Sequence, residues 1–383
     1  MSTRVTLPGG EELRLPAGDG WPVPTHPFRS RVAYAAAHVV PDPTAENGPG
    51  QPATLDWDTT LAFRHHLWRH GFGVAEAMDT AQRGMGLDYP ATRELIRRSC
   101  AEAREVGGAI VAGVATDQLP PGPATLDQVR AAYEQQLADV SQAGALPVLM
   151  CSRHLAAAAR SADDYLQLYD HLLTSADRPV LLHWLGEAFD PALAGYWGAD
   201  DLDAATETVL SLIAAHPDRI DGIKLSLLDA EREVAMRRRL PAGVRLYTGD
   251  DFHYPELIRG DEQGYSDALL GIFAAIAPAA AAALHALDAG DDSGYAAAMA
   301  PTVPLSRHIF AAPTQYYKTG IAWLAWLAGH QTHFTMVGGG QSGRSPVHLA
   351  QALILAAAAG LLPDPQLAAA RARAFFSVCG VPQ

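Results

Sequence analysis

One short stretch, Asp221-Gly222-Ile223-Lys224-Leu225-Ser226, places a charged side chain inside an apolar run of strand-forming residues. An ammonium group in such surroundings loses its hydration, and this loss lowers the pKa of the lysine. A neutral amine can attack a ketone and form an imine, which then accepts electrons during carbon–carbon bond making or breaking. The structural alternative is an ion pair between Lys224 and a neighbour such as Asp251, and the two interpretations are compatible.

The scarcity of lysine draws further attention to Lys224. The chain has 28 lysines and arginines together, and only Lys224 and Lys318 are lysines. Arginine can replace lysine as a surface cation, but it stays charged in proteins and cannot act as a neutral amine. The two remaining lysines are therefore candidates for function, and persistence by chance or for packing is the alternative.

Around this stretch, short apolar runs alternate with amphipathic segments of helical length. This alternation is typical of a parallel sheet wound with helices, and we predict an α/β fold of the (β/α)8 TIM-barrel type. The seven clear strand predictions are residues 32–40, 73–77, 109–114, 147–151, 179–184, 222–225 and 244–248. The predicted helices between them include residues 57–70, 90–106, 126–143, 162–175 and 203–216.

The two ends of the chain depart from this alternation. An eighth strand is only weakly indicated, within residues 267–276, and the pattern after it is helical. We expect residues 1–30 to form an extension with a β-hairpin, residues 31–278 the catalytic barrel, and residues 279–383 a helical region packed on the barrel. The helices predicted near and within this last region are residues 278–289, 293–311, 315–329, 347–359 and 365–376.

Composition limits the classes of partner. Acidic residues outnumber basic ones by 42 to 28, which gives a net charge of −14. A negative surface disfavours nucleic acid and anionic membranes as main partners, so we expect a small-molecule substrate.

The cysteines, Cys100, Cys151 and Cys379, have no paired or metal-type spacing. We expect a reducing, cytoplasmic location, and the first residues lack the apolar segment of a signal peptide.

Catalytic groups of such barrels lie at the carboxyl ends of the strands and in the loops that follow. If the strand predictions hold, polar residues from six strands converge on one mouth. These residues are His38, Glu76, Asp79, Thr80, Ser152, Arg153, His154, His183, Lys224, Ser226, Thr248, Asp250, Asp251 and His253.

Two of these positions invite specific roles. His183 ends an apolar strand, and a histidine there can move protons near neutral pH or serve only as a structural hydrogen-bonding group. Asp250 and Asp251 follow the seventh strand and could bind substrate hydroxyls, hold a divalent cation or cap a helix. We favour hydroxyl binding for the two carboxylates.

Three short motifs follow one another along the chain: Asp221-Gly222-Ile223-Lys224, Thr248-Gly249-Asp250-Asp251 and Gly343-Arg344-Ser345-Pro346. In these motifs and in their order, the chain resembles the dihydrodipicolinate synthase / N-acetylneuraminate lyase family of class I aldolases. The resemblance covers roughly residues 31–350. It implies that Lys224 forms the imine and that Lys318 lies in a C-terminal helix and is not the nucleophile. It also implies a homo-oligomer, a dimer or tetramer, because relatives commonly assemble in this way.

The chain differs from the family at the positions that bind the substrate in that family. The loop that binds the carboxylate of a 2-oxo acid corresponds to residues 79–83, where only Thr80 matches. The proton-relay tyrosine of the fifth strand corresponds to His183. These departures point away from pyruvate and towards another ketone or a sugar-derived compound. Arg83 or Arg153 could supply a replacement grip on a carboxylate, because a guanidinium binds this group with two hydrogen bonds.

The leading hypothesis is a lyase or aldolase without a cofactor, in which Lys224 and His183 are catalytic. Its predicted substrate-binding residues are Thr80, Asp250, Asp251, Arg153, His38 and Glu76. One alternative is a barrel isomerase, hydrolase or aldolase that binds a divalent metal through His38, Glu76, His183, Asp251 and His253. The other is a barrel that binds a small ligand without catalysis, since a fold alone does not fix a function.

Overall fold

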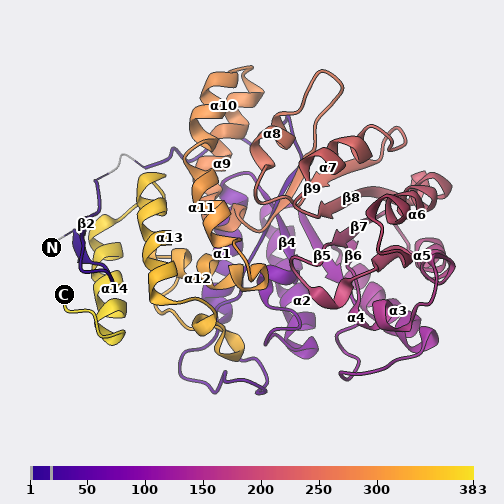
Figure 1. Ribbon diagram of the computed structural model, residues 1–383, viewed down its shortest axis with the longest axis horizontal. Helices are drawn as coiled ribbons and strands as arrows, with labels where there is room; N and C mark the ends of the chain where they lie inside the picture. The colour runs from indigo at the N-terminus through magenta and orange to yellow at the C-terminus, as the bar shows by residue number, and fades with distance from the viewer. Residues whose placement is uncertain (1–2, 18–19) are drawn as a thin grey trace.

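A computed structural model describes residues 3–17 and 20–383 of the chain. Its centre is a closed barrel of eight parallel strands in the order β3 to β10, in which β10 pairs with both β9 and β3 (Figure 1). The predicted TIM-barrel fold is therefore confirmed. The strands are β3 (Ala33–Ala36), β4 (Gly73–Glu76), β5 (Ile110–Val114), β6 (Leu146–Leu149), β7 (Val180–Leu185), β8 (Ile220–Ser226), β9 (Arg245–Thr248) and β10 (Asp267–Leu270).

Helices follow the strands and cover the outside of the barrel. Polar residues fix where they begin: Asp56 accepts a hydrogen bond from the Thr59 backbone at 3.0 Å, and Thr125 forms a capping box with Gln128. The helices are α1 (Trp57–Arg69), α2 (Tyr89–Val106), α3 (Leu126–Ala143), α4 (Arg153–Ala158), α5 (Ala162–Ser175), α6 (Leu202–Ala215), α7 (Ala230–Arg237), α8 (Tyr254–Arg259) and α9 (Phe273–Asp288).

The first and eighth strands are shorter than predicted. β3 ends at Ala36, so residues 37–40 have left the strand although they remain buried. β10 ends at Leu270, and α9 begins at Phe273 and continues through Pro278. The alanine-rich segment there is helical because alanine has the highest helix propensity. The barrel and the C-terminal helices are thus joined by a continuous helix across position 278.

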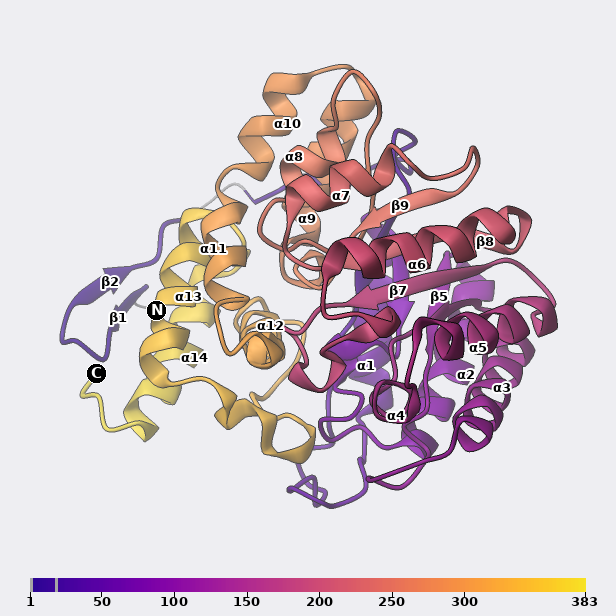
Figure 2. The ribbon, with the colours of Figure 1, turned by 45° about the vertical axis from the view of Figure 1, so that its right-hand side comes forward.

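The C-terminal helices stack on one side of the barrel, as Figures 1 and 2 both show. The single helix predicted for residues 293–311 is two helices, because Pro301 separates them; Pro304 lies in the first turn of the second helix, where proline is tolerated. The predicted hairpin, β1 (Arg4–Thr6) with β2 (Glu12–Arg14), lies against the last helix. The helices are α10 (Asp292–Met299), α11 (Thr302–Ile309), α12 (Tyr317–Leu327), α13 (Pro346–Ala358) and α14 (Pro365–Val378).

Side chains along the barrel strands alternate between the interior and the surrounding helices. The interior holds a separate apolar cluster that includes Tyr34, Val148, Leu181, Tyr247 and Leu269. The Tyr247 hydroxyl donates a hydrogen bond to Asp221 at 2.6 Å, near the start of β8. This packing fills the lower barrel, so a ligand can reach only the carboxyl ends of the strands.

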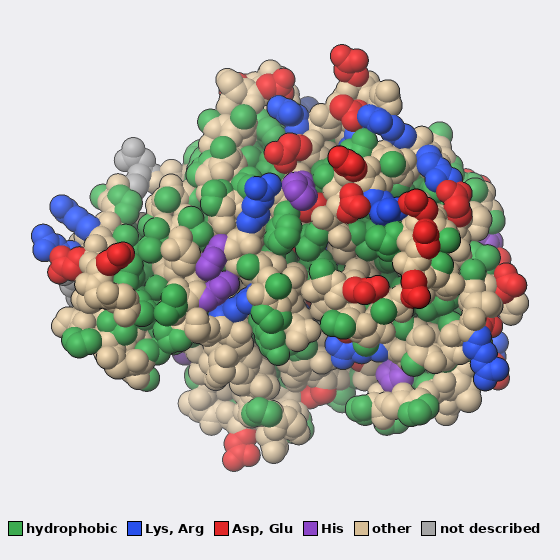
Figure 3. All heavy atoms as spheres, in the orientation of Figure 1, with side chains coloured by type: hydrophobic (Ala, Val, Ile, Leu, Met, Phe, Trp, Pro, Cys, Tyr) green, Lys and Arg blue, Asp and Glu red, His purple; other side chains and the backbone are tan. Residues whose placement is uncertain are grey.

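Acidic and basic side chains are interspersed on the face drawn in Figure 3, and no broad basic patch appears there. Among the described helices, none combines the length and the apolar character needed to cross a bilayer.

Candidate active site

Lys224 points into the barrel beside His183. The two residues are in register on the neighbouring strands β8 and β7, so their side chains lie on the same face of the sheet. Ile223 and Leu225, on either side of Lys224, join the outer core between the barrel and its helices. The strand therefore packs through its outer residues and holds the lysine inward.

Glycine at position 249 leaves room for the lysine. A Cβ atom on Gly249, just after β9, would collide with Ser226 Oγ and lie 2.8 Å from Lys224 Cε. The loop that follows β9 therefore passes directly against the lysine side chain. Position 249 therefore requires glycine, because there is no space for a side chain between the loop and Lys224.

The Lys224 amine is buried without a direct ionic partner. In the described part of the chain it makes no hydrogen bond, and no carboxylate oxygen lies within 4.0 Å of it. Burial lowers the pKa of Lys224, while the charges of Asp79 and Asp251 raise it. Burial is the larger effect, so the neutral amine is favoured at a lower pH than for an exposed lysine.

His183 is fully buried next to this amine. Its Nε2 lies 3.3 Å from Ser226 Oγ, and its Nδ1 has no hydrogen-bond partner among the described residues. Burial lowers the pKa of His183 well below its usual value, and the charge of Lys224 lowers it further. The imidazole is therefore neutral near pH 7 and can accept a proton from a bound molecule.

The two aspartates after β9 have different surroundings. One oxygen of Asp251 accepts a hydrogen bond from the Ile272 backbone at 2.9 Å, and burial raises the pKa of this carboxyl. Asp250 instead accepts from the backbone of Phe252 at 2.8 Å and of His253 at 3.0 Å, and from the His253 ring at 2.9 Å. Asp251 is the carboxylate near Lys224, whereas Asp250 holds the turn of the loop.

A tyrosine that the sequence did not single out completes this group. The Tyr317 hydroxyl, from the first turn of α12, lies 2.8 Å from Thr80 Oγ1. Burial raises the pKa of Tyr317 well above its usual value, and the charges of Asp79 and Asp251 add to the shift. Because Lys224 interacts with the same two carboxylates, the Tyr317 hydroxyl and the amine face the same part of the mouth.

A cavity of about 360 Å³ opens over the ends of β4 to β7. Asp79 lines it and also raises the pKa of Lys224 by its charge, and Arg153 stands at its rim with 55% of its side chain exposed. Arg153 Nε donates to Asp190 at 2.5 Å, which leaves its two terminal nitrogens without a hydrogen bond in the described chain. Cys151 also lines the cavity, but burial raises its pKa to about 12 and keeps the thiol protonated.

Glu76 and His38 lie away from this group. Glu76 faces outward from β4 and forms a fully buried ion pair with Arg64 of α1 at 2.8 Å, and it also accepts from Ser99. His38 Nε2 contacts Gln331 at 2.8 Å, and its ring packs against Phe63. Neither side chain faces Lys224, so their expected contact with a substrate does not fit their positions.

Arg83 is also fully engaged. Its guanidinium binds both oxygens of Asp117, the carbonyls of Ala77 and Gly113, and the side chain of Gln136. All five N–H donors therefore have partners within the protein. Arg83 therefore fixes the loop after β4. Arg83 and Arg153 were the two arginines expected to bind a substrate carboxylate, and only Arg153 has N–H donors left for that role.

The five residues of the metal-site alternative do not come together. Glu76 and His38 lie outside the barrel mouth, while His253 is bound to Asp250. Within the described residues, no group of three or more His, Cys, Asp or Glu side chains is arranged to hold a metal ion.

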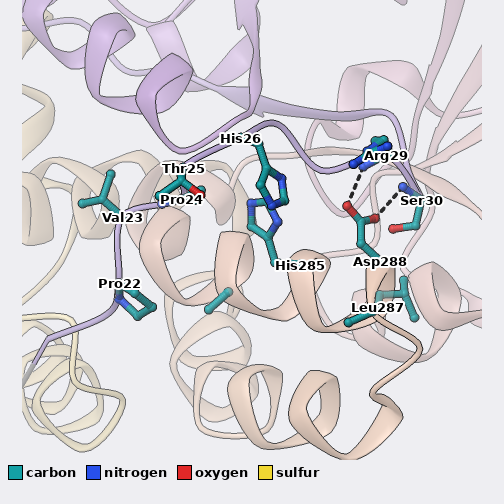
Figure 4. A pocket seen from close by; sticks show the side chains of 12 residues that line it. Pro22, Val23, Pro24, Thr25, His26, Arg29, Ser30, His285, Leu287 and Asp288 are labelled. Carbon is teal, nitrogen blue, oxygen red and sulfur yellow. Dashed lines mark hydrogen bonds between the residues drawn. The ribbon is translucent and has the colours of Figure 1, made fainter.

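A larger surface hollow, of about 820 Å³, lies elsewhere. It is formed by residues 22–30 and the end of α9, where His26 and His285 face each other and Asp288 accepts from the backbone of Arg29 (Figure 4). These segments lie at the end of the barrel where the strands begin. The hollow is therefore opposite the mouth and holds none of the candidate catalytic residues.

Comparison with known proteins places the chain in a family. A family model, described as a protein of unknown function (DUF993), matches residues 8–381. The chain belongs to the DUF993 family. No curated protein matches this DUF993 chain.

Solved structures similar to the DUF993 protein are dihydrodipicolinate synthases. The enzyme from Aquifex aeolicus has a TM-score of 0.64 at 11% identity, covering 87% of this chain and 99% of its own. The enzyme from Oceanobacillus iheyensis has a TM-score of 0.61 at 14% identity, with coverages of 91% and 97%. The chloride-inhibited enzyme from Acinetobacter baumannii, solved with pyruvate, has a TM-score of 0.64 at 15% identity, and the match covers 87% of this chain and 100% of that enzyme. The resemblance inferred from the sequence is confirmed at the level of the fold.

Proposed function

We propose that this DUF993 protein is a lyase or aldolase of the class I type that acts on the carbonyl group of a keto or sugar-derived compound. One observation supports this above the others: the Lys224 amine is buried in the barrel without an ion-pair partner in the described chain, next to proton-carrying groups. A lysine in such surroundings is an activated nucleophile.

The reaction we propose starts with attack of the neutral Lys224 amine on the carbonyl carbon. Both N–H protons of the amine pass in turn to the carbonyl oxygen, which leaves as water, and an imine remains. When the imine nitrogen is protonated, a base removes the proton of a hydroxyl on the carbon β to the imine carbon. The bond between the α and β carbons then breaks, the distal fragment leaves as an aldehyde or ketone, and the electron pair passes to the iminium to give an enamine. Protonation of the enamine carbon and hydrolysis of the imine then release the second product and restore the amine.

The groups around Lys224 suit the proton transfers of this sequence. Neutral His183 can accept a proton, and the Asp251 carboxyl, whose pKa is raised by burial, can donate or accept one near neutral pH. The Thr80–Tyr317 hydroxyl pair can pass a proton or orient a substrate oxygen. We assign Arg153 a weaker role, as a rim group that attracts an anionic part of the substrate.

The test is reductive trapping. The protein is incubated with a panel of 2-oxo acids, ketoses and aldehydes, treated with borohydride and analysed by peptide mass spectrometry. We expect a reduced adduct on Lys224 with at least one compound, and loss of that adduct in Lys224→Met. Because the chain has only one other lysine, Lys318→Met serves as the matched control and should keep the adduct formed with an uncharged ketone.

The trapping rate should also rise with pH. The neutral amine reacts, and burial lowers the pKa of Lys224, so the rate should reach half its maximum below the ordinary pKa of 10.5. A panel that yields no adduct on Lys224 at any pH would refute the proposal and favour a barrel that binds a ligand without catalysis.

A further inference from the structure

The second lysine lines a different cavity. Lys318, in the first turn of α12, borders a space of about 650 Å³ between the loop after β4, the start of α12 and the glycine-rich segment η6 (Val337–Gly343). Gln82, Met85 and Gly86 form the wall shared with the mouth, because Asp79 and Arg83 of the same loop lie on the mouth side.

Lys318 is a buried cation without an ionic partner in the described chain. Only 6% of the residue is exposed, and its amine donates to the Gln315 carbonyl at 3.1 Å and contacts Met85 sulfur at 3.5 Å. No carboxylate oxygen of the described residues lies within 4.0 Å of it. A buried charge without a counter-charge is costly, so the site favours an anion or loss of the proton.

The charged residues around Lys318 come from several elements. Asp79 after β4 and Asp190 after β7 raise its pKa, while Arg153 at the start of α4 lowers it. Burial is the largest effect and brings the pKa to about 8. Enough positive charge therefore remains near neutral pH to attract an anion.

The rest of the cavity lining is uncharged and rich in small residues. Lys318 is the only charged residue among those that line it, and four glycines of η6 line it with Gly50 and Gly86. Gly338 and Gly339 adopt φ values of 64° and 73°, which other residues rarely adopt. Glycines let a ligand approach the backbone closely, and the Tyr316 and Ser342 hydroxyls, which make no hydrogen bond within the described chain, can donate to it.

We propose that this cavity is a binding site for an oxyanion, the phosphate or carboxylate group of a small molecule, with Lys318 as its cation. The site shares no lining residue with the cavity at the mouth, but it adjoins the mouth across the loop that carries Asp79 and Thr80, and Lys318 Nζ lies 4.7 Å from the centre of the Tyr317 ring. The anionic group belongs either to a substrate that reaches around this loop or to a second small molecule that regulates the mouth.

Selective labelling tests the site directly because the chain has only two lysines. The protein is acylated with limiting acetic anhydride in inorganic phosphate, malonate or chloride at equal ionic strength, and the Lys318 and Lys224 peptides are quantified by mass spectrometry. We expect phosphate or malonate to slow acylation of Lys318, by roughly threefold at twice the dissociation constant, and to leave Lys224 unchanged. Equal protection of both lysines, or none relative to chloride, would overturn the proposal.

Thermal unfolding provides a second measurement with a matched pair of variants. The protecting anion should raise the melting temperature of the wild type and of Lys224→Met but not of Lys318→Met, and Lys318→Arg should keep the effect. An equal rise in Lys318→Met would contradict the assignment of Lys318. Because Lys224→Met cannot form the imine, an intact response there keeps this site distinct from the proposed reaction.

The origin of the anionic group follows from a competition experiment. If phosphate reduces reductive trapping of an anionic ketone on Lys224 but not of a neutral one, the cavity holds a distal part of the substrate. If it changes trapping of both alike, it acts as a separate ligand. Protection of Lys318 without any effect on trapping leaves the binding site in place as a separate anion site.

Discussion

Two buried charged groups near the strand ends are built in opposite ways. On the outer face of β4, Glu76 meets Arg64 in an ion pair at 2.8 Å, and both side chains have no exposed surface. Inside the mouth, Lys224 is also buried but has no ion pair in the described chain. The outer pair binds α1 to the barrel, whereas the inner amine is left free to react. The compensated charge fits a structural role, whereas an uncompensated one fits the role in catalysis or binding that we propose.

The largest effect should come from breaking the outer pair. Replacement of Glu76 by Ala leaves Arg64 buried and unpaired, so the free energy of unfolding should fall by about 3–5 kcal/mol. Urea denaturation measures this change. Glu94→Ala, which removes a partly exposed partner of Arg97 and Arg98, is the control and should cost no more than about 1 kcal/mol. A comparable loss in both variants would show that burial does not distinguish the two pairs.

An intermediate effect is expected at Tyr317. Tyr317→Phe removes the hydroxyl that contacts Thr80 but keeps the ring, which stacks on Phe310 at 4.4 Å between centroids. The rate of imine trapping on Lys224 should fall by roughly 10²-fold, the lower end of the usual range for general acid–base groups. Tyr316→Phe, at the neighbouring position outside the mouth, should retain the wild-type rate when the trapped ketone is uncharged. An unchanged rate in Tyr317→Phe would assign its hydroxyl to packing alone.

The smallest effect on stability should come from replacement of Lys224 itself. Lys224→Met replaces a buried, uncompensated amine by an apolar side chain of similar length, so unfolding free energy should stay within about 1 kcal/mol of the wild type or rise. Activity should be lost at the same time. If this variant instead loses as much stability as Glu76→Ala, Lys224 is a structural charge and the contrast between the two sites fails.

The sequence was sufficient for the barrel because its evidence is local and repeated. Apolar runs of strand length, separated by amphipathic segments, identified seven strands, and the inward position of Lys224 followed from one of them. The eighth strand was harder to delimit because the apolar residues on both sides of Ile272 suit a strand or a helix equally well. Packing against β3 and β9 decided its end.

The site was less predictable because its members depend on side-chain direction and on distant contacts. Glu76 lies at the end of β4, close to Asp79, but it points outward, and a shift of one residue reverses the face that a strand residue occupies. Tyr317 reaches Thr80 across 237 positions of sequence, and no local pattern indicates this contact. The sequence suggested that Arg83 binds an anion, but its guanidinium is occupied by Asp117 and Gln136, which lie in later segments of the chain.

Gly249 has a consequence for protein engineering. The amine of Lys224 keeps its place partly because position 249 has no side chain, since any Cβ there would meet Ser226 and Lys224. A library that diversifies the loop after β9 to change substrate preference should therefore hold this position constant. Gly48, by contrast, has no neighbouring atom within 4 Å of the place that a Cβ would occupy, so this position can be randomised freely. The freedom to evolve new specificities is thus greater in the loop after β3 than beside the proposed nucleophile.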